Sequence, residues 1–480
     1  FKFPKRVKSG LILEKFLFLI ATWVKGEKII RDNGKEEDFS KIYIDLEAKE
    51  DEDIVIVDIH DKPSHTIIKL TDLMFKKGKY IYNNYDEKYH ENIDHYKEII
   101  QSYQFKGIDL KDAEIDVATE VFTRLNVGGK VLTLFEIMVA KTYDQERDFD
   151  LYEKFQELVL ELQPTQYDTI SSANVLQLIS LLLKRDCKRK TILKLDKQEF
   201  INTWDDAVES IRGAVDFFRS FGIPVSKLLP YNALIVPFGY FFYHHQNNPT
   251  GDVFKLLEDF FWRTSLGFRY SSAVEGKLAQ DIEKIDKILK GEQPRYEWMI
   301  DISEEFIRNN GYFGTGRSLI KAILCLYSMQ NPKSFDNNLD VTIDNSWLKI
   351  ATSKNYHHFF PKKYMERNQP EWEYWQYNHI ANITIVDGFL NKNKIRAKAP
   401  SDYMNKFKEQ NNQLENTMKT HLIDNLDEFG IWEDNYEKFF DQRIKKISKE
   451  LEERIIPQRT KNKNLEKYED IDQMEDNNNH

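Results

Sequence analysis

The order of apolar and polar residues changes its period along the chain. Residues 42–46, 54–59 and 67–70 are rich in β-branched side chains and are separated by turn-forming residues, which predicts three short strands. From 116 to 142 the apolar residues recur at helical spacing on either side of Gly128-Gly129, which predicts helix, turn and helix. The N-terminal part is therefore expected to combine strands with helices.

Amphipathic helical patterns follow one another from about residue 150 to residue 330. In Asn174–Lys184 the apolar residues cover more than one face, as in a helix that is buried on several sides. Strand-like segments return at 356–360 and 380–386. The C-terminal half therefore carries a short mixed segment inside a largely helical sequence.

Helical patterning resumes over 401–455, and Ser401 is the expected N-cap of its first helix. These patterns together predict an α+β fold that is mostly helical. The 480 residues are enough for about three domains of ordinary size. We expect an N-terminal α/β part at 1–150, a helical region at 151–345, a short mixed module at 346–405, and C-terminal helices with a mobile tail at 406–480.

Composition narrows the class of protein. The two cysteines, Cys187 and Cys325, are far apart, which argues against a disulfide framework or a thiolate zinc site and favours a cytoplasmic location. No apolar run approaches the roughly 18 residues of a membrane span, so we expect no membrane partner. Homo-oligomerisation is left open by the sequence.

Charge is unevenly distributed along the chain. Its formal net charge is −10, so contact with a nucleic acid requires a local basic patch. The stretch 351–400 offers one, because its eight basic residues outnumber its four acidic residues by four. We expect a polyanion to be bound there, by Lys362, Lys363, Lys392 and Lys394.

Histidine and asparagine residues in the same stretch form the first candidate site. Neighbouring residues on a strand point to opposite faces, so one of His357 and His358 can bind a metal while the other faces a substrate. Imidazole suits both purposes, since it ligates divalent metals and its pKa is that of a general base near neutrality. Asn382 can hold such a ring, and Asn391 can return to the metal from the next helix. The alternative is a polar surface strand without chemistry.

The same residues carry a family resemblance. The segments His357–Lys362, Ile380–Asp387 and Lys398–Tyr403 follow one another, with Asn391 between the last two. They resemble the HNH, or ββα-metal, nuclease domain of GmrSD-type modification-dependent restriction endonucleases. The resemblance implies a nuclease module embedded in helices.

The resemblance also implies roles for individual residues. His358 would be the general base, and Asn382 the central Asn that orients it. His357 and Asn391 would hold a divalent metal, magnesium or manganese. The third member of the site is Asn rather than His, a variation that this family tolerates.

A second segment, Val121–Glu136, contains Phe-Thr-Arg-Leu-Asn-Val-Gly-Gly-Lys. It resembles part of the ParB-related, GmrS-like N-terminal domain of the same enzymes, which implies a weak nucleoside triphosphate site at Arg124, Asn126 and Lys130. Taken alone, such residues can simply cap two helices. The family's Asp-Gly-Gln-Gln-Arg motif is replaced by Leu13–Leu17, so we expect a truncated domain with inefficient nucleotide turnover.

Two further motifs have simpler interpretations. Gly311–Ser318 has the spacing of a phosphate-binding loop, with Arg317 in place of Lys, but it follows a helical pattern rather than a strand. His244 and His245 stand at the expected end of a helix, without an accompanying Asn series. We expect neither motif to be a site.

The resulting hypothesis is a metal-dependent DNA endonuclease that acts on modified phage DNA. Two alternatives stay open. One is a non-cleaving regulator or degenerate remnant that binds DNA or nucleotide, which the missing motif makes credible. The other is a nuclease that acts on RNA, because the hydrolytic chemistry is the same.

Overall fold

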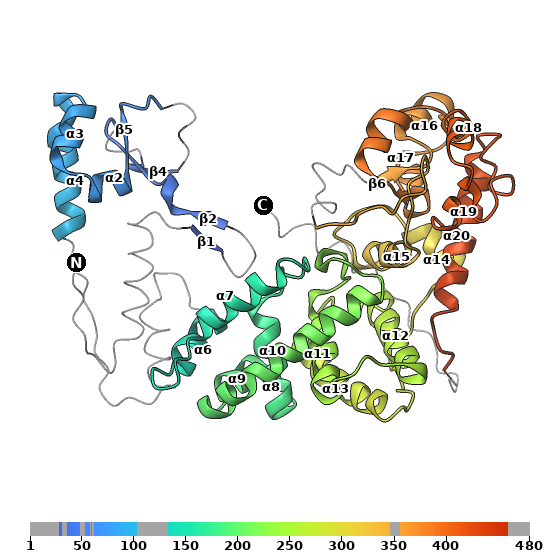
Figure 1. Cartoon of the computed structure of the whole chain (residues 1–480), viewed down its shortest axis with the longest axis horizontal. Coiled ribbons are helices and arrows are strands. Elements are labelled where there is room, and N and C mark those ends of the chain that lie inside the picture. The colour runs from blue at the N-terminus through green and yellow to red at the C-terminus, as the bar shows by residue number, and fades with distance from the viewer. Residues whose placement is uncertain are drawn as a thin grey trace. The chain divides into compact units, whose positions relative to one another are not determined.

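The structure of the chain, a computed structural model, describes residues 28–30, 36–48, 53–57, 59, 62–102, 133–345 and 356–458 (Figure 1). It forms two compact units, Phe1–Tyr143 and Asp144–His480. Most of the described elements are helices, which confirms an α+β protein that is mostly helical. Within these residues no helix combines the length and the apolar character needed to cross a bilayer. The expected nucleotide contacts lie outside the described residues: Arg124, Asn126 and Lys130.

The N-terminal unit contains a three-stranded antiparallel sheet in the order β4-β3-β5. Its strands are β3 (Tyr43–Asp45), β4 (Val55–Ile56) and β5 (Ile67–Lys69), and a separate antiparallel pair consists of β1 (Lys28–Ile30) and β2 (Glu36–Asp38). The helical elements are η1 (Phe39–Lys41), α2 (Leu70–Phe75), α3 (Gly78–Asn84), η2 (Glu87–Tyr89) and α4 (His90–Ser102). All three strands predicted between residues 42 and 70 are thus present, each shortened.

One buried cluster joins this sheet to the helices. Ile44 and Ile68 are partners across β3 and β5, and they pack with Leu73 and Ile81. The second predicted strand is reduced to the two residues of β4 at one edge of the sheet, where Val55 leaves 60% of its surface exposed.

The predicted helix after the Gly-Gly turn is α6 (Leu134–Thr142). Its N-cap Thr133 accepts a hydrogen bond from the Glu136 amide at 3.2 Å, and the Glu136 carboxylate accepts one from the Thr133 amide at 2.7 Å. This reciprocal capping box satisfies two amides that the helix itself cannot satisfy. The predicted first helix of the pair, over 116–127, lies outside the described residues.

The C-terminal unit begins with the helices predicted for the middle of the chain. They are α7 (Leu151–Leu162), α8 (Ser172–Lys184), α9 (Arg189–Leu193), α10 (Lys197–Ser220), α11 (Ile235–His244), α12 (Gly251–Leu266), α13 (Val274–Leu289), α14 (Glu304–Asn310) and α15 (Ser318–Met329), with the short turns η4 (Ser226–Leu228) and η5 (Asn232–Leu234). As predicted, α8 is buried on several sides. A Cβ added at Gly239 of α11 would lie 2.9 Å from the side chain of Leu178, so α8 and α11 cross closely because this residue is glycine.

Phenylalanine fills the space between these helices. The rings of Phe218 and Phe238 have centroids 4.6 Å apart, and Phe217 and Phe261 pack around them. All four side chains are buried. The high aromatic content of the sequence is thus explained in part by core packing in the helical region.

The last part of the chain mixes strands and helices. Its elements are β6 (Tyr356–His358), α16 (Lys362–Asn368), α17 (Tyr374–Tyr377), η7 (Ile380–Asn382), β7 (Ile383–Ile385), η8 (Leu390–Ile395), α18 (Pro400–Gln410), α19 (Leu414–Lys419) and α20 (Tyr436–Glu452). The segment predicted as a strand over 380–386 begins as a 3-10 turn, and only β7 is strand. The expected helices of the C-terminal region are present as three separate helices.

The prediction that Ser401 is a helix N-cap is wrong. The N-cap of α18 is Ala399, and Pro400 occupies the first helical position, where its fixed backbone angle and missing N–H are tolerated. Ser401 instead donates its amide and its hydroxyl to the two carboxylate oxygens of Asp434, at 2.8 and 2.7 Å.

After α20 the chain returns to α12. The carboxylate of Asp259 accepts a hydrogen bond from the Ile456 amide at 2.8 Å, and Arg263 donates to the Ile456 carbonyl at 2.6 Å. Asp259 and Arg263 also pair with each other at 2.9 Å, and both are buried. Residues 454–458, here termed the C-terminal strap, thus complete the hydrogen bonding of a buried ion pair.

Candidate active site around His358

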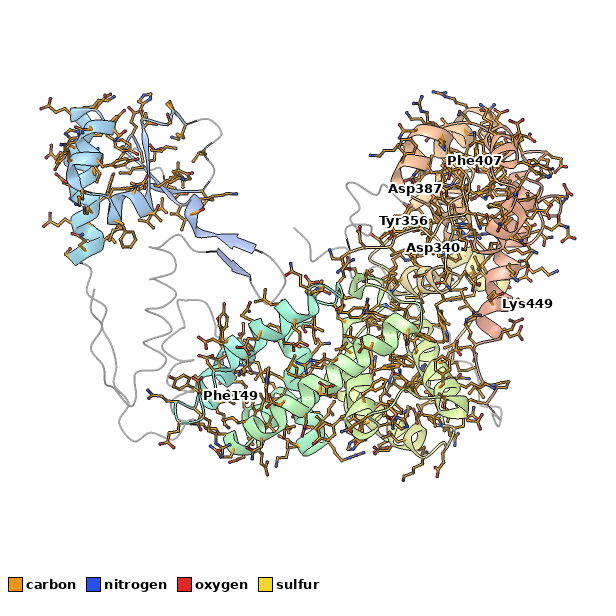
Figure 2. All side chains as sticks on the ribbon, viewed as in Figure 1. Phe149, Asp340, Tyr356, Asp387, Phe407 and Lys449 are labelled. Carbon is orange, nitrogen blue, oxygen red and sulfur yellow. The ribbon has the colours of Figure 1, made fainter. Side chains whose placement is uncertain are left out.

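β6 and β7 bring the candidate residues together. The two strands pair antiparallel, with Tyr356 opposite Ile385 and His358 opposite Ile383. The connection between them contains α16, α17 and η7, and η8 follows β7. Figure 2 labels Tyr356 within this densely packed part of the molecule. Asn382, which precedes Ile383, therefore lies beside the end of β6.

Asn378 fixes the tautomer of His358. The side-chain nitrogen of Asn378 donates to the Phe313 carbonyl at 3.3 Å, which turns its oxygen toward Nε2 of His358 at 2.9 Å. Because an amide oxygen only accepts, Nε2 carries the proton and Nδ1 keeps its lone pair. Phe313 also packs edge-on against the His358 ring, with centroids 6.3 Å apart. The ring is thereby held in one orientation with an unprotonated nitrogen.

His358 is neutral in this environment. Burial, followed by the positive charge of Lys362, lowers its pKa to about 3, against the opposing effect of the Asn378 hydrogen bond. His358 nevertheless keeps part of its surface exposed. A phosphate that approached the ring would stabilise its protonated form and raise this pKa. Without such an anion, a pKa of about 3 makes the ring a weak base at neutral pH.

Asn382 holds the backbone around His358. Its side-chain oxygen accepts from the Phe360 amide at 2.8 Å, and its nitrogen donates to the carbonyls of Phe360 and Tyr377 at 3.0 and 2.9 Å. The side chain is fully buried. Asn382 thus fixes the turn after β6, whereas the side chain that orients the His358 ring is Asn378. Sequence reasoning gave the orienting role to Asn382 and missed Asn378.

Arg443 of α20 supports the same segment from the other side. It donates to the carbonyls of Ala381 and Ile383, at 3.1 and 2.8 Å, on either side of Asn382. Its guanidinium lies 4.8 Å from the ring centroid of Tyr327. The side chain is fully buried, and burial lowers its pKa. Sequence reasoning missed Arg443, because it lies in an ordinary amphipathic helix far along the chain.

His357 faces the interior. Its Nδ1 lies 3.0 Å from the Thr384 hydroxyl, and its Nε2 is buried without a hydrogen-bond partner. Its ring has edge contacts with Phe335, Phe359 and Tyr403, at centroid distances of 6.0, 6.2 and 5.9 Å. Burial holds the pKa of His357 well below its usual value. The ring is therefore a neutral member of an aromatic core.

The second expected metal ligand, Asn391, lies in η8. Its side-chain nitrogen donates to the Tyr356 carbonyl at 3.3 Å. In the described parts of the chain, no group of three or more His, Cys, Asp or Glu side chains is arranged to hold a metal ion. As they lie, the aromatic-lined His357 and the backbone-bound Asn391 do not fit a metal centre.

The four lysines that the sequence predicts to bind a polyanion have different surroundings. Lys394 forms an ion pair with Asp336. Lys362 donates to the Tyr374 hydroxyl at 2.9 Å and lies close enough to act on the pKa of His358. The exposed members of the set are Lys363 and Lys392.

The two discounted motifs lie where the sequence predicts. The segment before Gly311 is the helix α14, and His244 is the last residue of α11.

A scan against known protein families gives no match, and a search of curated proteins gives none. Functional interpretation of the chain therefore depends on its own residues and their geometry.

Proposed function

We propose that the chain is a phosphodiester hydrolase that cuts DNA with His358 as its general base. The observation that carries this proposal is the fixed, neutral His358 ring, whose Nε2 is held by Asn378 and whose Nδ1 keeps a lone pair. Two antiparallel strands followed by a helical turn, with Asn382 and Arg443 holding the strand ends, lend it further support.

The chemistry assigned to His358 is removal of a proton from water. As the water oxygen bonds to phosphorus, Nδ1 accepts that proton, the phosphorus–oxygen ester bond breaks, and the departing sugar oxygen takes a proton from solvent water. The Nε2–H bond to Asn378 stabilises the resulting imidazolium, and the phosphate anion does so electrostatically. Lys362, whose charge already acts on His358, can offset part of the phosphate charge.

A divalent metal, magnesium or manganese, enters the proposal only through the family resemblance, which implies His357 and Asn391 as its ligands although they do not form a metal site as they lie. Metal binding at these residues requires His357 to leave its aromatic surroundings. Calorimetric titration with Mn²⁺ of the wild-type chain and the His357→Leu, Asn391→Ala double variant tests this part. Undiminished binding by the variant would place the metal elsewhere.

The wider hypothesis concerns the biological setting. The substrate would be modified phage DNA, and the activity would restrict infection of a bacterial cell. A nucleoside triphosphate would bind weakly at Arg124, Asn126 and Lys130 and would turn over slowly. Phosphate release from GTP, ATP and UTP measures that turnover directly.

The main rival is a protein that binds DNA or nucleotide without cutting. The enclosure of His357 by aromatic rings favours it, because an expected metal ligand behaves as a core residue. A nuclease for RNA is a second rival. Substrates with matched DNA and RNA strands separate these possibilities.

The decisive variant is His358→Ala. Loss of a general base lowers the rate by about 10²- to 10⁴-fold, whereas truncation of a partly exposed ring should leave the fold intact. Plasmid nicking is measured on modified and unmodified DNA, with magnesium, manganese or EDTA. The matched control is His244→Ala, at the exposed end of α11. Full nicking by folded His358→Ala protein would remove His358 from the mechanism.

A further inference from the structure

The glycine-rich loop between α14 and α15 is attached to the candidate site. The Gly311 carbonyl accepts from the Ile380 amide at 2.8 Å, and the Phe313 amide donates to the Asn378 carbonyl at 2.8 Å. A Cβ at Gly311 would lie 2.1 Å from Nε2 of His379, so this close approach requires glycine. The loop that resembles a phosphate-binding motif in sequence is thus held beside the residues that position His358.

Three large aromatic side chains are exposed at this loop and at α17. Tyr312, Tyr374 and Trp375 leave 41%, 49% and 47% of their surfaces exposed. The rings of Tyr312 and Tyr374 have centroids 6.5 Å apart. We refer to these three residues as the aromatic ledge. A contiguous exposed apolar patch of this kind is typical of a site that binds a ligand or another macromolecule.

The aromatic ledge is a near neighbour of His358. Tyr312 directly precedes Phe313, which contacts the His358 ring edge-on. Lys362, which lies 2.9 Å from the Tyr374 hydroxyl, begins α16 shortly after β6 ends at His358. A ligand that covers the ledge can therefore extend to His358.

Two basic side chains contact the aromatic ledge, Lys362 at Tyr374 and Arg317 at the Tyr312 carbonyl, 2.9 Å away, and they favour an anionic ligand that also has a flat ring. Lys362 Nζ lies 2.9 Å from the Tyr374 hydroxyl and 4.8 Å from its ring centroid. The one described acid bonded to the ledge, Glu373, accepts from the Trp375 indole nitrogen at 2.6 Å and thereby orients that ring. A nucleotide offers the required pairing, because its base stacks on an aromatic ring while its phosphate meets a lysine.

We propose that the aromatic ledge stacks an unpaired base of single-stranded DNA next to the phosphate presented to His358. Bases inside a duplex are already stacked on each other, so exposed tyrosine faces favour single-stranded or locally opened DNA. This proposal rests on the proposed function only where it places the bound strand next to His358. Stacking itself needs no cleavage.

Fluorescence anisotropy in EDTA measures this binding without strand cutting. The full chain is titrated into a labelled 20-nucleotide strand, the matching blunt duplex, and the duplex with a central unpaired gap. We expect the single strand and the gapped duplex to bind more tightly than the blunt duplex. Tyr312→Ala and Tyr374→Ala should each weaken single-strand binding by about tenfold, the usual effect of losing one stacking ring.

Two controls separate stacking from other effects. Tyr374→Phe keeps the ring but loses the hydroxyl bonded to Lys362, so its affinity should stay within about threefold of wild type. Phe75→Ala removes an exposed aromatic ring in the N-terminal unit and should change nothing. Circular dichroism confirms that each variant is folded.

The outcomes separate the aromatic ledge from the proposed nuclease activity. Wild-type affinity in both tyrosine-to-alanine variants, or a preference for the blunt duplex, would overturn the stacking proposal even if His358→Ala abolishes nicking. Binding of an apolar peptide in place of DNA would overturn it too. Conversely, weakened binding by the tyrosine variants together with full nicking by His358→Ala would support base stacking on the ledge and would exclude His358 as the general base.

Discussion

His357 and His358 are neighbours in sequence but meet opposite environments. The strand β6 turns one ring toward the aromatic core and the other toward Asn378. Only His358 combines partial exposure with a hydrogen bond that fixes its tautomer. The difference arises from strand alternation, so it does not depend on any property of the histidines themselves.

Asn378→Asp tests how the His358 tautomer is set. A carboxylate at the position of the amide would place a negative charge 2.9 Å from Nε2, which should raise the pKa of His358. Histidine-selective NMR titration of the full chain follows this shift. We expect the His358 ring to titrate at higher pH in the variant than in wild type, while the other rings keep their values. An unchanged titration would show that Asn378 does not control the ring.

His357→Leu tests whether His357 belongs to the core. The imidazole has one buried nitrogen without a partner, and leucine is apolar and of similar size. We expect the free energy of unfolding to fall by no more than about 1 kcal/mol, or to rise, because a buried unsatisfied group is removed. Urea denaturation measures the change. A loss of several kcal/mol would mean that the bond to Thr384 matters more than the unpaired nitrogen.

At the scale of elements, α20 matters more to the candidate site than its place in the sequence suggests. Arg443 donates to carbonyls that lie 62 and 60 residues earlier in the chain. These bonds satisfy η7 and β7 where the backbone changes from a 3-10 turn to a strand. The helix therefore stabilises the turn that carries Asn382.

Arg443→Met should destabilise the C-terminal unit. The variant leaves two buried carbonyls without their donor, and each such loss costs about 1–3 kcal/mol. We expect a free-energy loss of about 2–4 kcal/mol, read by urea denaturation, with faster hydrogen exchange at residues 381–383. Lys445→Met is the matched control, because Lys445 is exposed on the same helix. Equal free energies of unfolding in the two variants would show that Arg443 does not stabilise the turn that carries Asn382.

The extent to which sequence predicts this molecule follows from the range of each interaction. The three N-terminal strands, α8 and the helix before Gly311 were predictable from local periodicity. His358 and Asn382 could be selected because their chemistry and spacing are local. Asn378 and Arg443 could not, because their roles depend on contacts with distant backbone carbonyls.

At the scale of the whole molecule, buried histidines make stability depend on pH. Burial holds the pKa of His379 at about 4 and that of His421 at about 3, and it holds that of His357 well below its usual value. The unfolded chain takes up protons below pH 6.5, whereas these folded rings do not. Stability is therefore complete above pH 6.5 and is lost as the pH falls below it.

Urea denaturation at pH 7.5 and 5.5 should reveal this loss. With His358, whose pKa burial also lowers to about 3, four rings each contribute about 1.4 kcal/mol over the first unit below pH 6.5, so we expect a decrease of about 5 kcal/mol. Burial raises the pKa of Asp259 and of Asp281 from 3.8, which gives the opposite slope at lower pH. In His421→Gln the decrease should shrink by about one quarter. A decrease of the same size in that variant would exclude His421 as a source.

The C-terminal strap and α20 also determine when a newly made chain can complete its site. A nascent polypeptide that has emerged from the ribosome only as far as β7 already contains His358, Asn378 and Asn382. It still lacks Arg443 and the Ile456 backbone that pairs with Asp259 and Arg263. The site thus reaches its final support only after α20 and the C-terminal strap have left the ribosome, so the activity proposed for His358 would stay silent until then.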